Sequence, residues 1–141
     1  MRLLVPVDFS PGSRCAVERG FRLLPRVERA VFAYVLPLGM KELEDFLEPG
    51  ALEEAKRRAD EKMREFLASL SVEADEIDYI IAEGDPASVL LELANSGDYD
   101  AVLIPHKGHS YLVDVLIGSV TLKLVAKSTI PVIVVRKPEK C

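Results

Sequence analysis

The chain has 141 residues, of which 49% are hydrophobic and 29% charged, a balance typical of one globular domain with an apolar core. The formal charge of −5 at pH 7 argues against a nucleic-acid partner or an anionic membrane surface. No stretch approaches the roughly 20 apolar residues of a membrane span, and the first apolar run is too short for a signal peptide. We therefore expect a single domain over residues 1–141, located in the cytoplasm.

The two cysteines, Cys15 and Cys141, have neither a metal-binding nor a CxxC spacing. A reducing cytoplasm fits this cysteine usage. We expect Cys141, the last residue, to be a free and exposed thiol. No metal site held by protein side chains is predicted.

The first part of the chain reads as strand, helix, strand. Residues 3–7 form a nearly continuous apolar run, as expected for a strand that is buried on both faces. Ser10 and Pro11 then fit the N-cap and the first residue of a helix, which Pro25 ends. Residues 30–35 form the second apolar run.

The middle of the chain contains the longest helical pattern. Residues 41–70 place apolar side chains on one stripe and charged side chains on the other faces. The part before Pro49 is either a separate short helix or a loop. Residues 77–81 alternate in a way that predicts a third strand.

The last part repeats the same order. Asp85 and Pro86 predict a helix start, with an N-cap and a proline at the first position. Residues 101–104 and 131–135 are apolar runs that predict the fourth and fifth strands. Between these runs, Gly118 and Ser119 mark the start of a further helix.

Strands that alternate with helices predict an α/β fold with parallel pairing, right-handed crossovers and helices on both faces. The expected architecture is a three-layer α/β/α arrangement around a five-stranded parallel sheet, which is Rossmann-like. Ligands of such sheets bind beyond the carboxyl ends of the strands, where the strand order reverses.

The loop that follows the fourth strand carries groups suited to an anion. Gly108 lets backbone N–H groups approach a phosphate. The helix start at Gly118 and Ser119 offers unpaired N–H groups and the positive end of a helix dipole. Lys107 and His109, with His106, would supply positive charge that the acidic chain otherwise lacks.

This loop resembles the nucleotide motif of the universal stress protein family, G-x2-G-x9-G-[S/T]. Nine residues separate Gly108 from Gly118, and Ser119 follows. Residues 6–10 resemble the opening of that family, residues 84–87 its entry to a later helix, and residues 130–136 its closing strand. The resemblance covers essentially the whole chain.

The resemblance implies an adenine nucleotide alpha hydrolase-like fold and a regulatory protein without catalytic machinery. It implies ATP or a related adenine nucleotide as ligand, with Mg²⁺ or Mn²⁺. By resemblance Asp8 lies beside the nucleoside, Val35 lies against the adenine, and the loop backbone with Ser119 contacts the phosphates. The expected binding residues are Pro6, Val7, Asp8, Val35, Lys107, Gly108, His109, Gly118, Ser119 and Val120.

Other interpretations stay open at this point. Asp8 and Ser119 also fit as helix N-caps. Pro105 replaces the first glycine of the motif and has no N–H to give a phosphate, which favours an interaction module that binds no nucleotide. His106 to His109 also reads HxGH, a motif of nucleotidylyltransferases, but it follows the fourth predicted strand rather than the first.

A homodimer is expected from the closing strand. Its apolar residues lie last in the chain, and an apolar edge strand is unstable when left open. The resemblance also implies pairing of this strand across a two-fold axis. The residues concerned are Val132, Ile133, Val134 and Val135.

Overall fold

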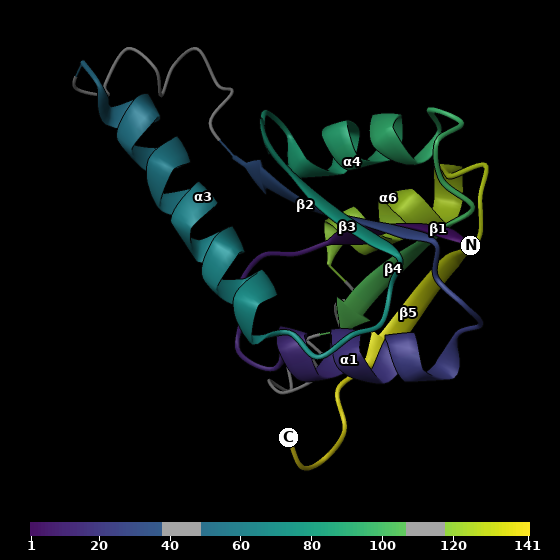
Figure 1. Ribbon diagram of the computed structural model, residues 1–141. Helices are drawn as coiled ribbons and strands as arrows, with labels where there is room; N and C mark the ends of the chain where they lie inside the picture. Colours follow the sequence, from purple (N-terminus) through teal and green to yellow (C-terminus); the bar gives the residue numbers. More distant parts are fainter. Residues whose placement is uncertain (38–48, 107–117) are drawn as a thin grey trace.

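The computed structural model describes residues 1–37, 49–106 and 118–141. Five parallel strands form one sheet in the order β3-β2-β1-β4-β5, and four helices of the described residues cover it (Figure 1). The predicted three-layer α/β fold is confirmed. The elements are β1 (Arg2–Pro6), α1 (Ser13–Leu23), β2 (Arg29–Leu36), α3 (Ala51–Ser69), β3 (Glu76–Glu83), α4 (Pro86–Ala94), β4 (Ala101–His106), α6 (Ser119–Lys127) and β5 (Val132–Arg136).

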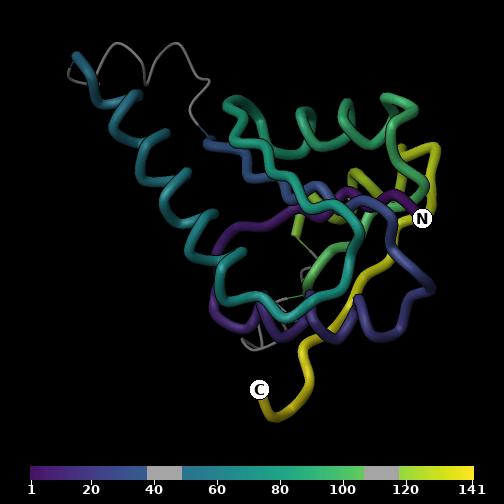
Figure 2. Tube along the Cα trace, viewed as in Figure 1, coloured from purple at the N-terminus to yellow at the C-terminus, as the bar shows by residue number. Residues whose placement is uncertain are grey.

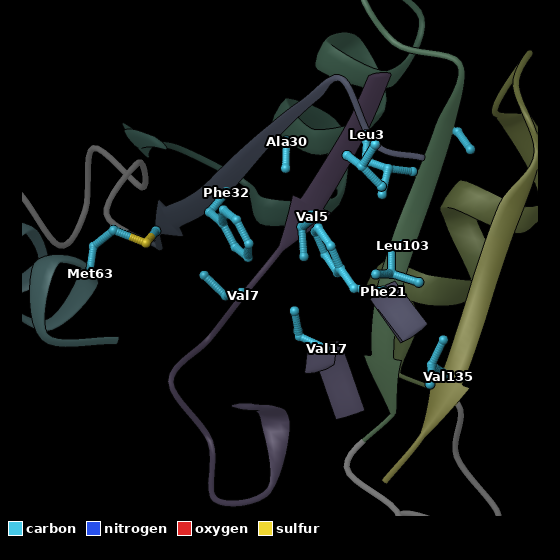
Figure 3. Packing of buried hydrophobic residues seen from close by; sticks show 12 residues of the cluster. Leu3, Val5, Val7, Val17, Phe21, Ala30, Phe32, Met63, Leu103 and Val135 are labelled. Carbon is cyan, nitrogen blue, oxygen red and sulfur yellow. The ribbon is translucent and has the colours of Figure 1, made fainter. Parts of the chain in front are cut away.

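Each face of the sheet has its own apolar core. Leu3 and Val5 of β1 face the layer of α1 and α3, where Phe32 and Met63 are also fully buried (Figure 3). Leu4, between them in the sequence, faces the layer of α4 and α6. This alternation is why the strands read as continuous apolar runs, since both of their faces are covered.

The strand order reverses at β1. The chain runs outward from β1 to β2 and β3, returns to pair β4 with the other side of β1, and ends at β5 on the edge. The gap beyond the carboxyl ends of β1 and β4 is therefore the switch point at which ligands of such sheets bind.

Two prolines lie where β1 and β4 separate. The strands are in register at Leu3 with Ala101 and at Leu4 with Val102. Backbone groups of successive residues point alternately to the two neighbouring strands. Because Val7 N–H donates to Ala33 and Val102 N–H donates to Pro131, the backbones of Pro6 and Pro105 are directed toward each other's strand.

Neither of these two prolines has an N–H to continue the ladder between the strands. β1 and β4 therefore part after their second register pair, and a crevice opens between their carboxyl ends. β4 continues in register with β5 as far as His106 and Arg136, so the separation is confined to the side that faces β1.

The start of α4 lies where the sequence predicted it, and the start of α1 does not. Asp85 caps α4 and Pro86 is its first residue, as predicted. The predicted start of the first helix at Ser10 and Pro11 is wrong, because α1 begins at Ser13 after Gly12, whose φ is 86°. Within the predicted helical region 41–70, residues 51–69 form α3, and residues 41–48 lie outside the described ones.

The expectation of a free thiol at the C-terminus is also wrong. Cys141 forms a disulfide with Cys15, and their Cα atoms are 5.8 Å apart. The reason is topological, because α1 begins and β5 ends at the same edge of the sheet. Among the described residues, no helix has the length and apolar character needed to span a membrane.

Gly20 sets how closely α1 approaches the sheet. A Cβ at this position would lie 3.0 Å from both Cδ atoms of Leu103 and 3.1 Å from a methyl group of Val135. Leu103 is fully buried, so it has little room to move. A side chain at Gly20 would push α1 away from β4.

We predict that Gly20→Ala lowers the free energy of unfolding by about 1 kcal/mol, because the overpacking cost exceeds the gain in helix propensity. Urea denaturation measures this change. The pair Glu65→Ala and Glu65→Gly, at an exposed position of α3, calibrates the propensity difference alone. A stabilisation by Gly20→Ala equal to that calibration would contradict the close-approach argument.

Candidate functional site

A cavity of about 510 Å³ lies at the carboxyl ends of the strands, where β1 and β4 part. This volume is within the range of small-molecule sites, roughly 300–1,000 Å³. Its walls come from the ends of β1, β2 and β4 and from the first turns of α4 and α6. The lining residues are Pro6, Val7, Asp8, Tyr34, Val35, Pro37, Pro86, Leu90, Ile104, Pro105, His106, Gly118, Ser119, Val120 and Thr121.

Most of the binding residues expected from the sequence line this cavity. The structure brings together Pro6, Val7, Asp8, Val35, Gly118, Ser119 and Val120 from three separate segments. The other three, Lys107, Gly108 and His109, lie outside the described residues.

The start of α6 supplies the positive end of the cavity. Gly118 occupies the N-cap position, and no side chain caps the helix among the described residues. Ser119 is the first helical residue, so its interpretation as an N-cap is wrong. The N–H groups of the first turn have no intrahelical partners, and the helix dipole adds to their attraction for an anion.

The start of α4, on the same side of the sheet, is already capped. Asp85 accepts hydrogen bonds from the N–H of Ser88 at 3.0 Å and from its hydroxyl at 2.7 Å. Lys123 of α6 donates to the Ser88 hydroxyl at 3.0 Å, which ties the two helices together. The Ser88 hydrogen bonds, and to a smaller extent the charge of Lys123, hold the pKa of Asp85 below its ordinary value. Of these two helix starts, the one at α6 therefore remains available to a ligand.

Asp8, in the loop after β1, also lines the cavity. Its Oδ1 accepts a hydrogen bond from the Ser10 N–H at 3.1 Å, which is the geometry of an Asx turn. The interpretation of Asp8 as the N-cap of α1 is wrong, since Gly12 occupies that position. Burial and, to a lesser degree, the charge of Asp8 raise the pKa of Tyr34.

Three polar cavity residues, Tyr34, His106 and Thr121, were not among the expected binding residues, although His106 was expected to supply positive charge. The His106 Nδ1 atom is buried and has no hydrogen-bond partner among the described residues. Strand alternation puts His106 on the same face as Val102 and Ile104, and this was a usable signal in the sequence. A buried polar atom without a partner is costly, so a ligand acceptor or donor at this point would be favoured.

The cavity has distinct apolar and polar regions. Val35, Leu90 and Ile104 are almost fully buried and form an apolar wall. The first turn of α6 and His106 provide the polar groups. This division suits a ligand with a flat, apolar ring at one end and an anionic group at the other.

The described residues contain no cluster of three or more His, Cys, Asp or Glu side chains able to hold a metal ion. A smaller hollow of about 390 Å³ lies beside the cavity, between α3 and the end of β2. One of its walls consists of α3, whose Glu54 and Arg58 are paired with each other across the hollow's rim. These charges are satisfied within the helix, so they point to no ligand.

The family model described as the universal stress protein family matches residues 1–136. Universal stress protein MJ0577 of Methanocaldococcus jannaschii is 26% identical over 157 residues, a match that covers 96% of this chain and 94% of that protein. Its solved structure has a TM-score of 0.68 and covers 99% of this chain and 97% of its own.

Two further solved structures share the fold. UspA from Lactobacillus plantarum has a TM-score of 0.71 at 23% identity, covering 96% of this chain and 97% of its own. The universal stress protein of Archaeoglobus fulgidus in complex with dAMP has a TM-score of 0.56 at 20% identity, covering 96% of this chain and 97% of its own.

The Asp85 cap makes a prediction about acid stability. Because the pKa of Asp85 is lowered in the folded chain, its charge stabilises the fold fully above the ordinary value of 3.8, and this stabilisation is lost as the pH falls below it. Asn caps helices nearly as well as Asp but carries no charge. We therefore expect Asp85→Asn to reduce the difference between the unfolding free energies measured at about pH 6 and about pH 3. An unchanged difference would show that the Asp85 charge does not stabilise the native state.

Proposed function

The chain belongs to the universal stress protein family, and we propose that it binds an adenine nucleotide, with ATP as the leading candidate, in the cavity where β1 and β4 part. The observation that carries this proposal is the start of α6, which no side chain of the described residues caps, beside an apolar wall. The adenine would lie against Val35, the nucleoside near Asp8, and the phosphates at the first turn of α6.

Among the described walls of the cavity, the start of α6 is the one that favours an anion. The chain is acidic overall, so long-range attraction cannot bring a polyphosphate to it. Among the described residues, the local N–H groups and the dipole of α6 would supply this attraction, and Lys107 and His109 are expected to add positive charge. The carboxylate of Asp8, which also lines the cavity, would repel phosphate and favour the hydroxyl groups of a sugar.

The dAMP complex of the Archaeoglobus fulgidus structure adds support for the base and the sugar. Its ligand is an adenine nucleotide, and its fold places strand ends in the same arrangement. The expectation of ATP in this chain rests on the resemblance of Gly108, Gly118 and Ser119 to the nucleotide motif.

Mg²⁺ or Mn²⁺ would arrive with the nucleotide in this proposal. The described residues offer no carboxylate cluster for the metal, whereas a nucleotide triphosphate supplies its own oxygen ligands. The ion would therefore be held by the phosphates and by water. Its chemistry at the site would be charge neutralisation.

A role in binding and regulation is proposed in place of an enzymatic one. A hydrolase would need a base that activates water or a hydroxyl group. The candidate base among the described cavity residues is His106, and its buried Nδ1 is paired with no cavity serine or threonine. The nucleotide would then act as a bound effector.

We also propose a homodimer through β5 in the cytoplasm. β5 is an edge strand, and an open apolar edge invites pairing with another chain. Val134 is 40% exposed, and Leu122 and Val125 of the neighbouring α6 are 57% and 59% exposed. A second copy of the chain would cover these side chains. The interaction module without nucleotide, favoured by Pro105, would use the same surface.

The first test is calorimetric titration of nucleotide-free protein with Mg·ATP, compared between the native chain and Ser119→Ala. Loss of one hydrogen bond to a charged phosphate predicts a Kd about tenfold higher. Ser69→Ala, a matched change on α3 far from the cavity, serves as the control. The absence of ATP, ADP and AMP binding below millimolar concentration would refute the proposal.

Pro105→Gly, measured in the same titration, distinguishes a nucleotide-binding protein from an interaction module that binds no nucleotide. Glycine would restore an N–H that points into the gap between β1 and β4, so tighter binding than in the native chain supports a ligand there. Binding gained only in Pro105→Gly would identify the native chain as an interaction module without nucleotide.

The dimer has its own test. We expect Val134→Asp to yield a monomer by light scattering, because a charge on each copy would face the other across the paired edge. Ile77→Asp is the matched control, since Ile77 is 41% exposed on β3 at the opposite edge of the sheet. A monomeric native chain at working concentration would contradict the dimer.

A further inference from the structure

The C-terminal tail folds back onto the first turn of α1. Beyond β5 the chain continues past the start of this helix and ends at Cys141 (Figure 2). There Cys141 forms the disulfide with Cys15, 126 residues earlier in the chain. The bond therefore joins the last residue of the chain to the helix that follows the first strand.

Two further contacts keep the tail in this place. Arg19 of α1 donates a hydrogen bond from Nη1 to the carbonyl of Arg136 at 3.3 Å. The Cδ of Lys137 lies only 2.8 Å from where a Cβ on Gly12 would be. Because Gly12 leaves this space open, the tail can pack directly against the loop that leads into α1.

The same loop reaches the cavity. It contains Asp8, which lines the cavity, and Phe9, whose φ of 61° is unusual for a residue other than glycine. Ser13 closes the loop by donating to the Ser10 carbonyl at 2.8 Å. The tail thus packs against one end of a short strained loop, residues 8–12, whose other end lines the cavity.

The cysteine pair is also placed for reversible chemistry. Cys141 is exposed and Cys15 is half-buried, so a small thiol can reach the bond. Cys15 is the third residue of α1, whose first turn contains no acidic side chain. The positive end of a helix dipole favours a thiolate, which is the form that reacts.

We propose that Cys15 and Cys141 form a reversible redox switch, in which oxidation clamps the tail on the loop that carries Asp8 and reduction releases it. The co-reactant is a low-molecular-weight disulfide. The Cys15 thiolate attacks one of its sulfurs and expels a small thiolate, which leaves a mixed disulfide on Cys15. The Cys141 thiolate then attacks Cys15 Sγ and expels the second small thiolate. The two protons lost by the cysteines end on the two small thiols, and excess thiol reverses both steps.

The clamp has a local and a distant consequence. Locally, the tail and the loop 8–12 lose mobility when the bond forms. At the cavity, the loop holds Asp8 in one position, so ligand affinity differs between the two redox states. This second consequence rests on the proposed nucleotide function, whereas the first does not.

The experiment equilibrates the native protein in oxidised and reduced glutathione mixtures, then counts free thiols by alkylation and mass spectrometry. Hydrogen exchange is followed in peptides that cover residues 8–16. We expect both thiols to be lost together as a disulfide forms within one chain. Hydrogen exchange in these peptides should slow at least about fivefold on oxidation. Cys15→Ser and Cys141→Ser should each show the reduced-state exchange in every buffer.

Equal exchange in both states of the native chain would overturn the switch, as would a disulfide that links two chains through Cys141. Titration with Mg·ATP in both states tests the distant consequence, for which a change in Kd of at least about threefold is expected. Equal Kd values overturn the link to the cavity. No binding in either state refutes the nucleotide function instead, and the exchange result still decides the switch.

Discussion

The position of the cavity depends on two prolines, which have no N–H group to donate between β1 and β4. Pro6 and Pro105 direct their backbones toward each other's strand, and neither can donate to the ladder between β1 and β4. The strands therefore part at the point where the strand order also reverses. Pro105 is tolerated in this interior strand because its missing donor faces the gap, while β4 keeps its register with β5 on the other side.

Two helices, α4 and α6, begin beside the point where β1 and β4 part, and their first turns differ in capping. Asp85 and Ser88 satisfy the first turn of α4, and Lys123 fixes α4 to α6. The first turn of α6 has no such cap among the described residues. The cavity thus combines N–H donors at α6, the Asp8 carboxylate and apolar side chains in its walls. Such a division orients an amphiphilic anion without any net positive charge on the protein.

The sequence predicted the elements whose signals are local. Apolar runs marked four of the strands, alternation over residues 77–81 marked β3, and Asp85 with Pro86 marked the start of α4. The start of α1 was missed because Asp8 accepts a hydrogen bond from Ser10 and holds the segment in a turn, so that Ser10 and Pro11 remain outside the helix. Local patterns also cannot show which side of a strand lacks a partner. Pro105 therefore read as a lost phosphate contact, whereas the fold makes it one wall of the crevice. The disulfide was missed for a related reason, since only the topology brings residues 15 and 141 together.

β5 connects these features, because it is an edge strand whose end leads directly into the tail. Its position next to β4 leaves one side unpaired and exposes Val134 beside α6. Its direction, parallel to the other strands, delivers the tail to the edge where α1 begins and where the cavity opens. A partner chain would therefore pair along the open side of β5, and the oxidised tail would act at the carboxyl end of the same strand. The loop with Asp8 and the first turn of α6 both line the cavity, so the proposed redox switch and the proposed ligand would act at the carboxyl ends of the same sheet, and the proposed dimer would pair along its edge strand.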